Sequence, residues 1–149
     1  TSPFTYVAKA AANDVWSFEF DTGTNTISID YAAPGQAICT DSPVGFFRSA
    51  GHSFFFVVPA GVKDIAIKIA PDPNEPVSAA LIDPAGKTVH AIADATNAFI
   101  LKHHREDAAK DEIWSLAFPD ALEDYSFRLG APLPPLVATA PENLLITTP

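Results

Sequence analysis

The sequence predicts an all-β fold, an antiparallel β-sandwich of about eight or nine strands. Apolar segments with alternating side chains recur at spacings of roughly 8–15 residues, and turn-forming residues separate them. Fourteen prolines against seven glycines add many points where a helix or a central strand must stop. With 149 residues and a hydrophobic fraction of 48%, the chain is expected to form a single domain, residues 1–149, with a packed core.

The first expected elements form a β-hairpin near the N-terminus. Residues 15–21 alternate, and three aromatic side chains fall on one face that we expect to lie in the core: Trp16, Phe18 and Phe20. Residues 22–25 form the turn, and residues 26–31 the returning strand. A loop over residues 32–42 follows.

Residues 53–70 carry the clearest pattern of the chain. An apolar segment, residues 53–58, ends at Pro59-Ala60-Gly61, and isoleucines then alternate along residues 63–70. This pattern predicts two strands of one sheet that are joined by a tight turn. A short strand within residues 44–48 is expected to precede them.

The second half of the chain continues with strands and turns. Residues 77–82 and 88–92 flank Asp83-Pro-Ala-Gly-Lys87, in which proline favours the first turn position and glycine accepts a positive φ. The remaining expected strands are 98–103, followed by a loop, then 111–118 and 125–129. In residues 111–118, Trp114 shares a face with Leu116 and Phe118, which places it in the core. Residues 130–149 form an extended, proline-rich segment that is expected to lead away from the domain.

The charge excludes several kinds of partner. A net charge of −9 and a pI of about 4.6 disfavour nucleic acid, an anionic membrane surface and a highly sulfated glycan. The nine basic residues are scattered, and no local basic patch is visible in the sequence. No apolar run approaches the ~20 residues that a membrane-spanning helix needs.

The cysteine and methionine content bears on how the chain is used. A single cysteine, Cys39, rules out an intrachain disulfide, and its apolar neighbours predict a buried thiol. The sequence contains no methionine and no signal peptide. We therefore expect a domain excised from a longer protein.

Catalytic motifs are missing from the sequence. HExxH, zinc-spaced cysteines, GxSxG and phosphate-binding glycine loops do not occur. An enzyme is therefore not expected, and no cofactor is implied. A structural Ca²⁺ site is the one exception that the sequence leaves open, because side chains with oxygen ligands are frequent in the expected loops. They are Asp14, Asp21, Asp72, Asn74, Glu75, Asp107, Asp111, Glu112, Asp120, Glu123 and Asp124.

Carbohydrate binding is the remaining chemistry that the residues suggest. Aromatic rings stack on the apolar faces of sugars, and polar side chains around them bind the hydroxyls. Some aromatics lie outside the clean strand alternations, and two polar residues stand near them. The candidate ligand-binding residues are Tyr6, Phe46, Phe47, Arg48 and His52.

Several segments resemble known accessory modules. Residues 54–61 (Phe-x-Phe-Val-Val-Pro-Ala-Gly) and 79–89 (Ala-Ala-Leu-Ile-Asp-Pro-Ala-Gly-Lys-Thr-Val) resemble pre-peptidase C-terminal-like domains of secreted bacterial hydrolases. Glu112-Ile-Trp-Ser-Leu116, Glu123-Asp-Tyr-Ser-Phe-Arg-Leu129 and Pro134-Pro-Leu-Val-Ala138 are similar to jelly-roll modules of bacterial carbohydrate-active enzymes. The resemblance covers roughly residues 46–145. These are strand and turn motifs, so they transfer no functional residue.

The resemblance implies a jelly-roll-like sandwich in a secreted or periplasmic bacterial protein. The expected function is a noncatalytic carbohydrate-binding module, covalently linked to a catalytic domain, with a polysaccharide or oligosaccharide as partner. It would raise the local concentration of the enzyme on its polymer. Two alternatives stay open: a structural module that packs against the catalytic domain, and a small hydrolase.

Overall fold

The computed structural model describes residues 17–19, 37–42, 44–46, 51–122 and 124–145. Within these ranges the chain forms ten strands and one 3₁₀ helix, and no helix is long and apolar enough to cross a membrane. The elements are β1 (Ile38–Cys39), β2 (Val44–Phe46), β3 (His52–Val58), β4 (Asp64–Pro71), β5 (Val77–Ile82), β6 (Thr88–Ala95), β7 (Phe99–His104), β8 (Glu112–Ala121), β9 (Tyr125–Leu129), β10 (Leu136–Val137) and η1 (Pro141–Asn143).

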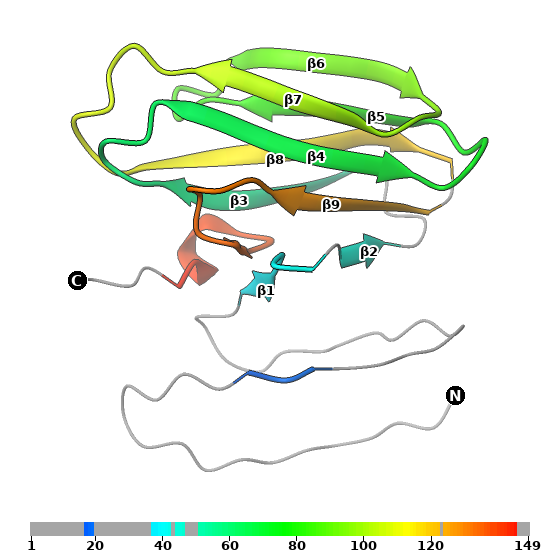
Figure 1. The fold of residues 1–149 in the computed structure, drawn as a ribbon, viewed down its shortest axis with the longest axis horizontal. Coiled ribbons are helices and arrows are strands. Elements are labelled where there is room, and N and C mark those ends of the chain that lie inside the picture. Colours follow the sequence, from blue (N-terminus) through cyan, green and yellow to red (C-terminus); the bar gives the residue numbers. More distant parts are fainter. Residues whose placement is uncertain (1–16, 20–36, 43, 47–50, 123, 146–149) are drawn as a thin grey trace.

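Eight of these strands form two four-stranded antiparallel sheets that stack face to face (Figure 1). Sheet I has the strand order β2-β9-β4-β7, and sheet II has the order β3-β8-β5-β6. The short strands β1 and β10 pair with each other. The predicted antiparallel β-sandwich is confirmed.

The pairing of the strands follows the rule of a jelly roll. β5 pairs with β6 around the hairpin turn, and β4 with β7, β3 with β8, β2 with β9 and β1 with β10 enclose it in succession. Successive pairs from β2–β9 to β5–β6 lie alternately in sheet I and sheet II. This is one long hairpin rolled into two sheets, the arrangement that defines the jelly roll.

Residues 53–70 form the two predicted strands, but the prediction that these strands belong to one sheet is wrong. β3 belongs to sheet II and β4 to sheet I, so Pro59-Ala60-Gly61 carries the chain from one sheet to the other. Gly61 adopts a φ of +83°, and the Val62 N–H donates to the Pro59 carbonyl at 3.2 Å. Both strands bury alternate residues in the core, but they belong to different sheets and share no hydrogen-bond ladder.

Aromatic side chains fill the space between the sheets. The rings of Phe118 and Tyr125 stack with centroids 4.2 Å apart, and Phe54 contacts both Phe118 and Phe127, at 6.0 and 5.0 Å. Trp114 is only 3% exposed, which confirms its predicted place in the core. Aliphatic residues of β4, β5, β7 and β8 complete the buried cluster: Ile65, Ile67, Ile69, Val77, Leu81, Leu101 and Leu116.

Two predictions for the N-terminal third of the chain, the hairpin strand that contains residues 17–19 and the burial of Cys39, disagree with the structure. Most of the hairpin over residues 15–31 lies outside the described residues, but residues 17–19 form no strand and Phe18 is 54% exposed. Cys39 is exposed because the residues on both sides of it point inward. Ile38 of β1 packs on the core, and Thr40, which follows β1, is fully buried. Residues 38–39, predicted as loop, pair with β10.

The C-terminal segment packs on the sandwich through residue 145 and does not lead away from it over this range. Leu133, Val137, Ala138 and Leu144 are buried. The backbone of Ala138 exchanges two hydrogen bonds with Phe55 of β3, at 2.7 and 2.9 Å. Apolar side chains between the prolines anchor the segment, so the proline content alone was a misleading guide.

Candidate functional site

The predicted ligand-binding residues are only partly within the described chain. Tyr6, Phe47 and Arg48 lie outside it. Phe46 belongs to β2 of sheet I, opposite Tyr125, whereas the exposed His52 begins β3 of sheet II, opposite Phe118. Because these two residues belong to different sheets, a binding surface that contains both stays a prediction.

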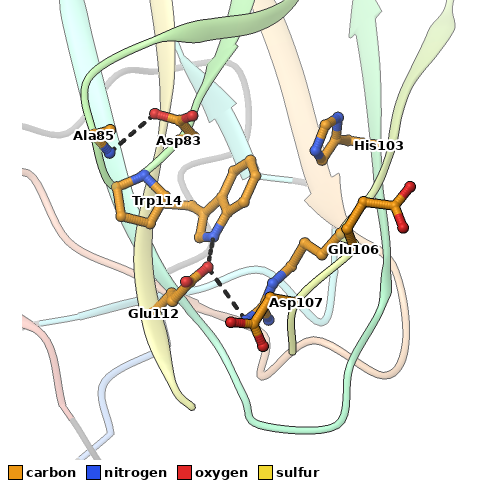
Figure 2. Close-up of a pocket in the computed structure, with 9 residues that line it drawn as sticks. Asp83, Ala85, His103, Glu106, Asp107, Glu112 and Trp114 are labelled. Atoms are coloured by element: carbon orange, nitrogen blue, oxygen red, sulfur yellow. Dashed lines mark hydrogen bonds and ion pairs between the residues drawn. The ribbon is translucent and has the colours of Figure 1, made fainter. Parts of the chain in front are cut away.

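A pocket of about 300 Å³ lies at one end of the sandwich (Figure 2). We call it the end pocket. It is formed by the β5–β6 turn, the end of β7, the loop after β7 and the start of β8. Its lining residues are Asp83, Pro84, Ala85, His103, Arg105, Glu106, Asp107, Glu112 and Trp114.

A largely buried ion pair forms part of the wall of this pocket. Arg105 is 3% exposed, and its Nη2 lies 3.2 Å from Glu112 Oε2, which also accepts a hydrogen bond from the Trp114 indole at 3.1 Å. The same guanidinium donates to the carbonyls of Val62 and Lys110 at 3.0 and 3.1 Å. Arg105 therefore fastens the β3–β4 crossover and the β7–β8 loop to the end of the sandwich.

Four of the loop carboxylates bind the main chain. Asp83 Oδ1 accepts hydrogen bonds from the N–H groups of Ala85 and Lys87, at 2.9 and 2.8 Å. Further carboxylates accept from backbone N–H groups at 2.7 to 3.0 Å, namely Asp111 from Ala60, Asp107 from Ala109 and Glu75 from Asp124. These acids therefore shape loops, a role that the sequence pattern does not distinguish from Ca²⁺ binding.

Metal-ligating groups do not gather in the described part of the chain. No three histidine, cysteine or acidic side chains come close enough there to hold an ion. Asp14, Asp21 and Glu123 lie outside the described residues. The Ca²⁺ site stays a prediction without a candidate set of ligands.

The adjacent histidines point to opposite faces of β7, as strand alternation requires. His103 packs against Trp114 with ring centroids 5.3 Å apart, and Figure 2 shows it beside the end pocket. His104 is on the other face, with Nδ1 2.7 Å from Asp64 Oδ1. A second hollow, of about 430 Å³, shares His103 and extends along Asp64, Ile65, Ala66, Lys102 and His104.

This hollow adjoins the solvent-facing side of sheet I, which we call the outer face. Alternation with the buried residues of β4, β7 and β9 defines its members: Asp64, Ala66, Lys68, Ala70, Ile100, Lys102, His104, Ser126 and Arg128. Lys68 lies directly opposite Ile100 on one side and Arg128 on the other. Ala66 lies opposite Lys102.

The outer face and the end pocket differ as places for a ligand. The outer face is an exposed sheet surface, and the end pocket is a small hollow between loops. Ala66 and Ala70 lie on either side of Lys68 along β4, and long side chains of β7 and β9 lie beside them. Three side chains of the face are exposed hydrogen-bond donors, Lys68, Lys102 and Arg128, and Ile100 is a 47% exposed apolar neighbour. The residues that line the end pocket include no hydroxyl or thiol nucleophile.

Sequence reasoning missed the outer face because its residues come from three separate segments. Each of β4, β7 and β9 contributes one cation, and only the register of the sheet brings them together. The alternation of Lys68 between isoleucines was the one available signal. No protein-family model and no curated protein matches the chain.

Proposed function

We propose that the protein is a noncatalytic accessory module that binds polysaccharide on the outer face of sheet I. It would act as part of a secreted bacterial enzyme that degrades the same polymer. The observation that carries the proposal is the exposed outer face itself, on which three exposed donors and an exposed Ile100 lie on neighbouring strands. An exposed sheet face that spans several strands suits a ligand that is a long chain.

The chemistry of sugars matches the groups on this face. Lysine and arginine side chains donate hydrogen bonds to sugar hydroxyls, and an aliphatic side chain contacts the apolar face of a sugar ring. Anchoring the module on a polymer raises the concentration of the linked catalytic domain at its substrate without new catalytic contacts.

The end pocket supports a structural role more than a hydrolytic one. Glycoside hydrolysis needs two carboxyl groups that are free to act on the scissile bond. Three of the four acids that line the pocket are engaged, Asp83 and Asp107 by backbone N–H groups and Glu112 by Arg105 and Trp114.

Affinity electrophoresis in gels that contain single polysaccharides tests the proposal. Ile100→Ser should weaken retardation by the bound polymer, because it removes the exposed apolar contact. The matched control is Ile113→Ser, which changes an isoleucine of similar exposure, 38%, on sheet II. Failure of every polysaccharide to retard the chain, on gels and on a glycan array, would contradict the proposal.

A second candidate function rests on the solvent-facing side of sheet II. Alternation along β3, β5 and β8 places uncharged residues there: Ser53, Phe55, Val57, Ala80, Ile82, Ile113, Ser115 and Ala117. An apolar sheet face of this kind would pack against the linked catalytic domain. In the longer protein, Ile113→Lys should then separate the thermal unfolding of the two domains, and Ile100→Lys should not. A single unchanged transition in Ile113→Lys would rule this packing out.

A further inference from the structure

The outer face of sheet I is cationic in a chain that is strongly acidic. The protein has eighteen acidic residues and nine Lys and Arg, yet three adjacent strands place Lys102, Lys68 and Arg128 on this one face. Lys68 and Arg128 are direct cross-strand partners, and Lys102 lies opposite Ala66, two residues from Lys68 along β4. Because neighbouring strands lie about 4.8 Å apart, the three cations form a short oblique row across the sheet.

Within the described part of the chain, these cations have no carboxylate partners. Among the described residues, none of the three has an acidic group within the distance of an ion pair. The one acid on the same face, Asp64, contacts His104 at 2.7 Å. The row therefore keeps its positive charge available to a ligand.

The placement of Lys68 and Arg128 is unfavourable for the fold alone. They are direct cross-strand partners, and like charges in that position destabilise a sheet. Residues that are unfavourable for stability at their own position tend to concentrate at functional sites.

We propose that this row binds the carboxylates of an acidic polysaccharide, a polyuronate. The inference rests on the proposed function and names its class of ligand. Arg128 can hold a carboxylate through two parallel hydrogen bonds, and the lysines add point charges on the neighbouring strands. The row runs across the strands, so the polymer chain should cross β7, β4 and β9 and not follow one of them.

The overall charge favours a polyuronate over denser polyanions. A net charge of −9 repels nucleic acids and highly sulfated glycans at long range, and three cations do not offset it. A polyuronate carries a single carboxylate on each uronic acid. Its lower charge density matches a small row of cations beside an apolar contact at Ile100.

The test uses polygalacturonate and the same polymer after chemical reduction of its carboxylates to neutral alcohols. Isothermal titration calorimetry with the whole chain should show binding to polygalacturonate that weakens as salt increases. The double variant Lys68→Gln/Arg128→Gln should bind about tenfold more weakly, whereas Lys87→Gln, an exposed lysine in the β5–β6 turn, should bind like the original chain.

The possible results separate this inference from the proposed function. Equal binding of the reduced polymer, or unchanged binding by the double variant, would overturn the inference and leave polysaccharide binding intact. Equally tight binding of dextran sulfate or single-stranded DNA would overturn the choice of a polyuronate. If no polysaccharide binds, the proposed function fails together with the inference.

Discussion

Arg105 and Glu112 form an ion pair at the point where the chain passes between the two sheets, with Nη2 and Oε2 3.2 Å apart. The arginine side chain is 2% exposed and the glutamate side chain 20%. Buried pairs of this kind contribute little net stability, but loss of one partner leaves the other charge without compensation. The pair therefore makes the end of the sandwich sensitive to single substitutions.

Arg105→Met is expected to lower the free energy of unfolding by about 3 kcal/mol. The substitution keeps an unbranched side chain, but it leaves the Glu112 carboxylate without its cation and removes the donors to the Val62 and Lys110 carbonyls. Urea denaturation followed by tryptophan fluorescence measures the change. Lys110→Met, at an exposed lysine of the same loop, should stay within about 0.5 kcal/mol of the original chain.

A second substitution shows whether the unpaired carboxylate causes the loss. In Arg105→Met/Glu112→Gln the carboxylate is gone, and the glutamine oxygen can still accept from Trp114. The double variant should therefore recover part of the lost stability. Equal stability of Arg105→Met and the original chain would contradict this view of the ion pair.

Phe118 links the two sheets through its aromatic contacts, and its truncation should be among the most damaging changes. The ring is fully buried in β8 and stacks on Tyr125 of β9 at 4.2 Å. Phe118→Ala should cost about 3–5 kcal/mol because it leaves a cavity between the sheets. Ile113→Ala, at a partly exposed position of the same strand, should cost much less in the same denaturation experiment. Similar losses in both variants would show that this inter-sheet contact is unimportant.

Local patterns in the sequence predict the strands, and they fail where strand partners are distant. The alternation of apolar side chains identified β3 and β4. It does not show whether two successive strands are hydrogen-bonded neighbours in one sheet or belong to opposite sheets. The β5–β6 hairpin was predicted correctly because Asp83, Pro84 and Gly86 specify a turn within five residues. The jelly-roll order depends on pairings such as β2 with β9, which no local signal encodes.

The proposed binding surface was harder to predict for the same reason. Lys68, Lys102 and Arg128 are scattered in the sequence and become neighbours only through the register of three strands. Cys39 was placed in the core because its neighbours are apolar, but pairing of β1 with β10 turns Ile38 inward and Cys39 outward. In both cases a long-range pairing decides which face a side chain occupies.

The β5–β6 turn allows a test that separates stability from ligand binding. Asp83→Ala removes the acceptor for two backbone N–H groups and should cost about 1 kcal/mol. Asp83→Asn keeps a side-chain oxygen and should recover much of this loss. Although Asp83 lines the end pocket, polysaccharide binding should stay unchanged in both variants, because the proposed ligand binds the outer face of sheet I. Reduced binding in the folded Asp83→Asn variant would move the site to the end pocket.

Gly130 is the position where the smallest addition should disturb the outer face. Its N–H donates to the Ala66 carbonyl at 2.8 Å, and a Cβ built on Gly130 would lie 2.8 Å from that same oxygen. Since the obstacle is backbone, it cannot rotate away, and Gly130→Ala should destabilise the chain by about 1–3 kcal/mol. Gly45→Ala is the matched control, because no described atom lies within 4 Å of its added Cβ. Thermal unfolding of the two variants measures the difference, and equal midpoints would show that β4 and the end of β9 can separate at no cost.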